Sequence, residues 1–179
     1  MKMTSSSSAR SLAVVCALAL TVPVVQSRDL GVLPCNRLDQ VRTVVSMDRD
    51  ITVDGNGSLK VVAEQGASVT LVDQDGFHVG EGNIFWCVAK VKGAGVKQRA
   101  YLEMWCEFDK MGRAFSKGLG QILQGDTDWV EVRLPMMINQ PALLKRALVN
   151  VVIEGPGTVW VDEVKFYSES GLSTVPQSK

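Results

Sequence analysis

The sequence feature that most constrains the fold is the two-residue alternation of residues 84–108. Apolar side chains occupy every second position on both sides of residues 92–97, a glycine-containing segment typical of a turn between two strands. The apolar set is Phe85, Cys87, Ala89, Val91, Leu102, Met104, Cys106 and Phe108. Because side chains along a β-strand point to alternate faces, the pattern predicts a hairpin with one apolar face.

The alternation also predicts a register for this hairpin, with Phe85 opposite Phe108 and Cys87 opposite Cys106. A slip of one residue would exchange the core and solvent positions of the moved strand, so the register is strongly specified. On the other side, Trp86 would then face Glu107. We expect this side to be a solvent-facing aromatic and acidic strip, made of Trp86, Tyr101, Glu103, Trp105 and Glu107.

A second strong strand signal lies at residues 158–166, after the turn sequence of residues 155–157. The segment is rich in β-branched and aromatic residues, which suits a half-buried strand that closes a sheet. Alternation places four side chains on one face, those of Trp160, Asp162, Val164 and Phe166. Asp162 must therefore reach the rim of the fold or be compensated inside it, because an unpaired buried carboxylate costs several kcal/mol.

Similar short strand and turn signals recur through the rest of the chain. Strands are expected at residues 58–62, 68–72, 129–134 and 146–154, and residues 109–120 read as an irregular glycine-rich loop. About eight short strands without a helix of useful length predict an all-β fold, a two-sheet antiparallel β-sandwich of the jelly-roll kind. Full closure into a small barrel is the alternative.

The N-terminal residues 1–27 have the layout of a secretory signal peptide, with a basic start, an apolar run and small residues before a cleavage point after Ser27. A transmembrane anchor is the alternative, but the run contains Pro23 and is shorter than the roughly 20 residues a spanning helix needs. We therefore expect a secreted or periplasmic protein without a transmembrane anchor after processing. Residues 28–167 would form a single jelly-roll domain, and residues 168–179 a polar, disordered tail.

Charge and cysteine content exclude some classes of function. Nineteen basic residues balance nineteen acidic ones and no basic run is present, so nucleic acid is not an expected partner. Three cysteines remain after processing, which leaves at least one thiol unpaired or paired with another chain. Cys87 and Cys106 would be either a disulfide or two buried thiols, and Cys35 can pair with another chain.

No residue pattern indicates catalysis. Glu103 and Glu107 would lie roughly 13 Å apart along one strand, whereas glycoside hydrolases need carboxyl groups about 5 or 6.5–9.5 Å apart. The single histidine, His78, lies in no motif with a serine or cysteine nucleophile. The chain is therefore predicted not to be an enzyme.

Three segments resemble the opening, middle and closing signatures of galactose-binding-like jelly rolls. They are Asp-Gly-Asn-Gly-Ser-Leu-Lys-Val at residues 54–61, Gly-Asp-Thr-Asp-Trp at 125–129, and Gly-Pro-Gly-Thr-Val-Trp-Val-Asp-Glu-Val at 155–164. The chain is similar in this respect to carbohydrate-binding modules of families four and twenty-two. Residues 101–108 also resemble a stretch in uncharacterised bacterial exported proteins of that fold. The similarity spans residues 45–166.

The resemblance implies a structural calcium ion. In those modules an aspartate of the closing strand helps to hold calcium opposite the binding face, and the matching position here is Asp162. Oxygen ligands suit calcium, and a bound cation would explain a carboxylate on an apolar face. The acidic and aromatic pattern that supplies other ligands in those modules is not recognisable in residues 28–46.

The aromatic and acidic strip is the best candidate binding surface. Sugars stack their C–H faces on aromatic rings and form hydrogen bonds with acidic and amide groups, and the strip supplies aromatic rings and acidic groups. Alternatively, residues 109–120 or 135–145 cover the strip, and Trp86 and Trp105 then have only a packing role. Trp129 and Trp160 are expected to be structural. The leading hypothesis is a non-catalytic exported module that binds carbohydrate or a cell-envelope glycan. The alternative is a protein-interaction or structural domain of the same fold with no sugar ligand.

Overall fold

A computed structural model describes residues 27–33 and 45–170 of the chain, and every regular element in these ranges is a strand. The nine strands are β1 (Ser27–Leu33), β2 (Ser46–Asp48), β3 (Ser58–Ala63), β4 (Gly66–Val79), β5 (Asn83–Phe108), β6 (Gly112–Lys117), β7 (Leu123–Met137), β8 (Leu144–Glu154) and β9 (Gly157–Ser170). The prediction of an all-β fold is confirmed. Among the described residues there is no helix with the length and apolarity needed to cross a membrane.

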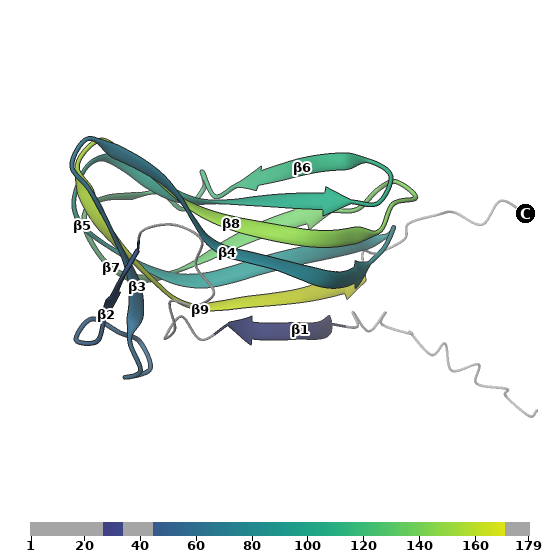
Figure 1. Ribbon diagram of the computed structural model, residues 1–179, viewed down its shortest axis with the longest axis horizontal. Coiled ribbons are helices and arrows are strands. Elements are labelled where there is room, and N and C mark those ends of the chain that lie inside the picture. The colour runs from purple at the N-terminus through teal and green to yellow at the C-terminus, as the bar shows by residue number, and fades with distance from the viewer. Residues whose placement is uncertain (1–26, 34–44, 171–179) are drawn as a thin grey trace, which may run out of the picture.

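Both layers of the sandwich are built around β5. Its first half, residues 83–94, lies between β9 and β7, and its second half, residues 99–108, lies between β8 and β6. The first layer therefore has the order β2-β3-β9-β5-β7, with β1 paired to the free part of β9, and the second layer has the order β4-β8-β5-β6. All pairs are antiparallel, and Figure 1 shows the strands curling over at the end where the two layers join.

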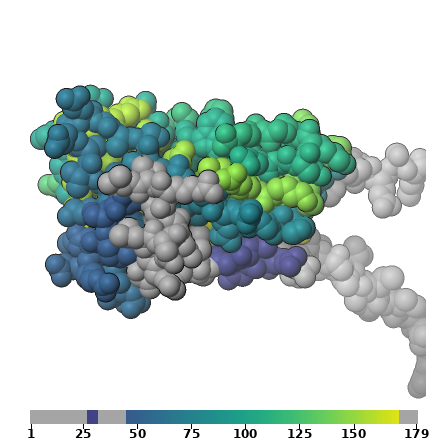
Figure 2. All heavy atoms as spheres, in the orientation of Figure 1, coloured from purple at the N-terminus to yellow at the C-terminus, as the bar shows by residue number. Residues whose placement is uncertain are grey.

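The core lies between the two layers and is almost entirely apolar. Phe77 from the second layer packs edge-on against Phe85 and Phe166 from the first layer, with ring centroids 5.0 and 5.3 Å away. Phe85 and Phe166 are themselves stacked at 5.5 Å. Leu30 of β1 packs against the same core, and Figure 2 shows β1, in purple, along one edge of the molecule. Burial of this large apolar area is the main source of stability.

The predicted hairpin of residues 84–108 is wrong, although the predicted apolar face is right. β5 is a single 26-residue strand, and the two halves pair with other strands rather than with each other. Phe85 and Leu102 nevertheless both face the core. Gly95 adopts a left-handed backbone with φ of 59°, and the pairing with β7 is irregular around it. This irregularity shifts the alternation by one residue, so odd positions face the core before it and even positions after it.

A second irregularity lies in β9 and corrects the predicted face of the closing strand. Glu163 has φ of 49°, and the pairing with β5 shifts by one residue at this point, which is the signature of a β-bulge. Val161 and Val164 therefore both face the core, together with Phe166, while Trp160 and Asp162 lie on the outer side. The prediction that Asp162 shares a face with Phe166 is wrong because it assumed an unbroken strand.

The described cysteines are buried thiols. Cys87 in the first layer and Cys106 in the second both face the core, and no disulfide joins them. Burial raises the pKa of the Cys106 thiol to about 12, so it stays protonated at neutral pH. Cys35 lies outside the described residues, as do the predicted signal peptide up to residue 26 and the tail from residue 171. β9 runs to Ser170 and so extends past residue 167, where the domain was expected to end.

Candidate functional site

Four of the five predicted site residues lie together on the outer face of the second layer. Tyr101, Glu103, Trp105 and Glu107 alternate along the second half of β5 with residues that fill the core, so their side chains point outward. Tyr101 and Glu103 are nevertheless buried, and Trp105 and Glu107 are half-buried. Neighbouring side chains must therefore cover part of this surface.

Much of the cover comes from β6, which pairs with β5 over residues 103–108. Phe115 lies opposite Trp105 with ring centroids 5.0 Å apart and remains 55% exposed. The guanidinium of Arg113 lies over the Trp105 ring, and the ammonium of Lys117 lies 5.9 Å from the centre of the Tyr101 ring. The expected irregular loop at residues 109–120 is thus wrong for residues 112–117, and the expectation that this segment covers the strip is partly right.

The Glu103 carboxylate is held in place from three directions. It accepts hydrogen bonds from the indole nitrogen of Trp105 and from Nδ2 of Asn150 at 3.3 Å, and Lys117 Nζ lies 3.3 Å from its second oxygen. The Thr70 hydroxyl in turn donates to Oδ1 of the Asn150 side chain at 2.8 Å. These contacts fix the rotamers of the polar side chains around Trp105, which is the preorganisation a binding site requires.

A second charged group borders the aromatic pair. The guanidinium of Arg146 makes two hydrogen bonds with the Asp73 carboxylate, at 2.6 and 2.7 Å, and a third with Glu107 at 3.4 Å. Arg113 also pairs with Glu107 at 3.4 Å. The hydrogen bonds to Asp73 raise the pKa of Arg146 above its usual value, so the guanidinium is charged at any accessible pH.

We call this surface the Trp105 face. It comprises Tyr101, Glu103, Trp105, Glu107, Arg113, Phe115, Lys117, Arg146 and Asn150. Sequence reasoning missed the contributions of β6 and β8. The alternation of Arg113, Phe115 and Lys117 with smaller residues could have revealed β6, whereas nothing local to Asn150 or Arg146 shows that β8 lies beside β5.

The structure does not bring Trp86 to the Trp105 face. Trp86 lies on the outer face of the first layer, because the two halves of β5 belong to different layers. Its indole nitrogen donates to Glu169 at 3.1 Å, and its ring stacks on Tyr167 with centroids 6.2 Å apart. The predicted five-residue strip is therefore two surfaces on opposite layers, and Trp86 is half-buried on its own side.

Asp162 lies beneath the segment of residues 48–57, at the outer side of β9, and is only 1% exposed. One carboxylate oxygen accepts hydrogen bonds from the Val53 amide at 2.9 Å and the Thr52 hydroxyl at 3.3 Å. The other accepts the Glu163 amide at 2.8 Å. The carboxylate is thus compensated by a neighbouring loop, one of the two outcomes that its sequence position allowed.

The same contacts bear on the predicted calcium ion. Calcium takes six to eight oxygen ligands, often several carboxylates, whereas the groups around Asp162 are mainly hydrogen-bond donors. No group of three or more His, Cys, Asp or Glu residues suited to a metal occurs in the part of the chain that the structure describes. The described residues alone do not fit a calcium site, and calcium at Asp162 stays a prediction.

Trp160 and Trp129 do not extend either surface. The indole nitrogen of Trp160 donates to Asp48 at 2.9 Å, and Lys60 lies over its ring, so this tryptophan is buried beside the segment that covers Asp162. The hydrogen bonds that Asp48 accepts from Trp160, the Ile51 amide and Lys60 hold its pKa near 2. Trp129 is half-buried in β7.

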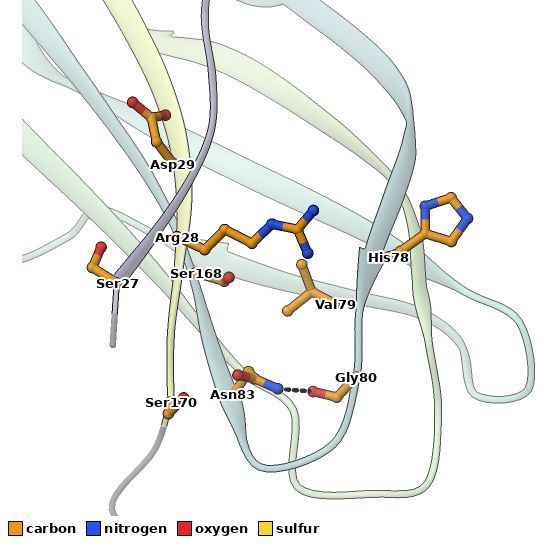
Figure 3. A pocket seen from close by; sticks show the side chains of 9 residues that line it. All are labelled: Ser27, Arg28, Asp29, His78, Val79, Gly80, Asn83, Ser168 and Ser170. Atoms are coloured by element: carbon orange, nitrogen blue, oxygen red, sulfur yellow. Dashed lines mark hydrogen bonds between the residues drawn. The ribbon is translucent and has the colours of Figure 1, made fainter. Parts of the chain in front are cut away.

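A cavity of about 550 Å³ lies at one end of the sandwich, between β1 and β4. Figure 3 shows the Arg28 side chain crossing it toward Val79, whereas the His78 ring lies on the far side of β4. The Asn83 amide is used to brace the nearby turn through the Gly80 carbonyl at 3.0 Å. The residues that line this cavity do not bring His78 together with a serine hydroxyl as a nucleophile–base pair would require.

No protein-family model and no curated protein sequence matches the chain. Among solved structures, it is similar to the CBM22-1–GH10 modules of Clostridium thermocellum endo-1,4-β-D-xylanase 10B complexed with xylohexaose, with a TM-score of 0.55 and 11% identity over 77% of this chain and 28% of that one. It is also similar to the CBM22-1 xylan-binding domain of Paenibacillus barcinonensis Xyn10C, with a TM-score of 0.46 and 16% identity over 83% of this chain and 87% of that one.

A cyclase from Fischerella sp. TAU has a comparable similarity, with a TM-score of 0.46 and 11% identity over 86% of this chain and 93% of that one. At these identities the similarity shows the fold. The chain has a β-sandwich fold like that of carbohydrate-binding modules, as predicted. It spans little more than a quarter of the two-module xylanase chain, 28%. Because one fold can carry unrelated roles, function has to be argued from the site.

Proposed function

We propose that this protein is a non-catalytic module that binds carbohydrate through the Trp105 face. The observation that supports this most directly is the pair of rings formed by half-buried Trp105 and exposed Phe115, set among fixed polar groups. A pyranose ring has one face rich in C–H groups, which packs on an aromatic ring, and a rim of hydroxyl groups, which needs hydrogen-bond partners. The Trp105 face offers both within one surface.

The polar groups around the rings are suited to hydroxyl groups. Glu107 is half-buried and paired with Arg113 and Arg146, so each oxygen keeps a lone pair for a ligand hydroxyl while its position is fixed. Asn150 and Lys117 are oriented by Glu103 in the same way. Ligand binding would therefore cost little side-chain entropy, which is one of the costs that weaken surface sites.

We further propose that the protein acts outside the cytoplasm, where such a module would meet extracellular or cell-envelope glycans. The support is the signal-peptide pattern of residues 1–27. N-terminal sequencing of the protein secreted by its own host tests this: the mature chain should begin at Arg28. An intact Met1 would contradict export by cleavage.

The alternative function, a protein-interaction domain, has its own support. Phe115, Leu119 and Ile122 expose about half of their surfaces near the edge formed by β6. Exposed apolar side chains that gather in one region are typical of protein–protein contacts. On this hypothesis Phe115 would contact a partner protein rather than a sugar.

Isothermal titration calorimetry distinguishes these functions. Xylohexaose is a rational first ligand because it was crystallised with a two-module xylanase chain, part of which is similar to this protein, and soluble glucans, mannans and galactans complete the panel. Trp105→Ala should weaken binding at least tenfold, about 1.4 kcal/mol, and Phe115→Ala should weaken it by a smaller factor. Val62→Ala, at an exposed apolar position on β3, is the matched control and should bind normally.

The outcome that contradicts the proposal is clear. Unchanged affinity of a folded Trp105→Ala variant would mean that the Trp105 face is not the site. Failure of the whole panel to bind, together with a concentration-dependent oligomer that Phe115→Ala abolishes, would support the protein-interaction function instead. Circular dichroism and thermal melting check that each variant is folded.

A further inference from the structure

We propose that the outer face of the first layer carries a second saccharide site, centred on Tyr167, so that the module binds on two opposite faces. The inference rests on the proposed function for its class of ligand and on independent residues for its location. A groove of about 460 Å³ lies on this face, within the size range of small-molecule sites. It is lined by Asp29, Val88, Glu131, Arg133, Lys165, Tyr167 and Glu169, and before processing also by Ser27, the residue that precedes the proposed cleavage point.

The sheet register explains why these residues converge. Val88 of β5 lies directly between Arg133 of β7 and Lys165 of β9, so an apolar side chain is flanked by two cations. Two positions further along, and so on the same face, Trp86 of β5 lies opposite Tyr167 of β9. Val88 is buried and Tyr167 half-buried, and both line the groove.

The Tyr167 ring is held at a fixed angle. It stacks on Trp86 with an interplanar angle of 16°, and Trp86 is in turn fixed by its hydrogen bond to Glu169. A ring immobilised in this way can receive the C–H face of a sugar without losing side-chain entropy. Burial raises the pKa of the Tyr167 hydroxyl, so that it remains a hydrogen-bond donor at physiological pH.

The charges at the rim favour a neutral ligand. Glu131 accepts hydrogen bonds from Arg133 Nε at 2.9 Å and Lys90 Nζ at 3.3 Å, and these bonds lower its pKa, so it is ionised. Lys165 pairs with Glu163 at 3.4 Å. Because Glu131, Arg133 and Lys165 already have partners of opposite sign, an anionic ligand would have to break an ion pair, and it would also meet the carboxylates of Asp29 and Glu169 in the same lining. A neutral polyhydroxyl compound can instead add hydrogen bonds to lone pairs and N–H groups that the pairs leave free.

Two sites on opposite layers give the module a property that one site cannot give. A single polysaccharide chain cannot lie flat on both faces, so each face would take a separate chain or a separate segment. The protein would then cross-link glycans, and the combined affinity for a dense polymer would exceed that of either face alone.

Nuclear magnetic resonance of the full-length, ¹⁵N-labelled protein tests the two faces separately. Neutral hexasaccharides of xylose, glucose, mannose and galactose are titrated one at a time. At least one should shift the backbone amides of Val88, Lys165 and Tyr167. Tyr167→Ala should weaken this response at least tenfold and leave any response at Trp105 unchanged, whereas Tyr167→Phe should retain it within about threefold.

Arg133→Glu is a second variant in case loss of the Tyr167 ring prevents folding, because Arg133 is exposed and lies at the rim. It should weaken the groove response several-fold. If every hexasaccharide shifts only the amides around Trp105, the second site is overturned and the proposed function stands. Shifts confined to the groove would overturn the Trp105 face and keep the second site, and the absence of shifts at both faces would overturn both.

Discussion

Replacing Asp162 with alanine should destabilise the protein more than any other change to a polar residue of the first layer. The side chain is buried and accepts three hydrogen bonds, which tie the segment of residues 48–57 to the bulge in β9. Alanine removes all three acceptors. The Thr52 hydroxyl keeps a partner, because Oδ1 of Asp54 lies 3.2 Å from Thr52 Oγ1 and can accept its hydrogen bond instead.

The expected cost comes from two backbone amides that would lose their acceptor. Those of Val53 and Glu163 bond to the carboxylate at 2.9 and 2.8 Å. A buried donor left unsatisfied costs about 1–3 kcal/mol. Val53 lies in an exposed segment, where water can replace part of the lost bond. The total should therefore be about 3 kcal/mol, a large fraction of the stability of a typical domain.

Guanidinium unfolding followed by tryptophan fluorescence measures this free energy. Asp54→Ala is the matched control: Asp54 is an exposed carboxylate in the same segment, bonded to Asn56, and its loss should change the free energy of unfolding little. A change below about 1 kcal/mol for Asp162→Ala would refute the view that this carboxylate anchors the segment. The same guanidinium unfolding, measured with calcium and with a chelator, tests the predicted ion. Bound calcium should raise the unfolding midpoint of the wild type and not that of the Asp162→Ala variant.

Three further perturbations test other parts of the structure. Hydrogen bonds from Trp160, Ile51 and Lys60 lower the pKa of Asp48 to about 2. The ionised carboxylate therefore stabilises the folded state above about pH 4, and this stabilisation is lost as the pH falls toward 2. Asp48→Asn should lower the free energy of unfolding in urea by about 2 kcal/mol at pH 7 and by almost nothing at pH 2. Glu163→Gly should stabilise the protein by about 0.5–1 kcal/mol in thermal melts, because glycine adopts φ of 49° without the strain of a side chain, and Glu163→Ala should not. A loss of stability with glycine would argue for an unbroken strand. Cys106 should resist Ellman's reagent in the native protein and react after denaturation, since burial raises its pKa to about 12, and rapid native labelling would contradict its burial.

The alternation along β5 correctly predicted which of its side chains are buried. The predicted pairing of its two halves with each other was wrong. A two-residue period reports only which face of a strand is covered. A hairpin turn and a bulge at Gly95 both allow apolar positions to change from odd to even numbers, so the sequence around this glycine is compatible with either. The choice is made by the neighbouring strands. β9 and β7 flank the first half of β5, and β8 and β6 flank the second half, so neither half has a free edge for self-pairing.

β9 illustrates a different limit. Its composition and its opening turn identified the strand, but the bulge at Glu163 places Trp160 and Asp162 on the face opposite Val164 and Phe166, whereas all four were predicted to share one face. Glutamate carries no local preference for a left-handed backbone. The bulge is stabilised by tertiary contacts, since it lets Asp162 meet the Val53 amide while both flanking valines stay in the core. Such a contact joins segments more than a hundred residues apart and has no local sequence signal.

The irregularity of β5 around Gly95, which replaces the predicted hairpin turn, also determines how the functional surfaces are arranged. Had residues 84–108 paired with themselves, Trp86 and Trp105 would share one surface and a single ligand could span both. In the observed fold β5 carries Trp86 out of the first layer and Trp105 out of the second, and each gains an aromatic partner from a different strand, Tyr167 or Phe115. Because no saccharide can touch both rings at once, the effects of Trp86→Ala and Trp105→Ala on binding should be independent and additive. Coupling between them would require the two layers to move together, which their separate hydrogen-bond networks do not provide.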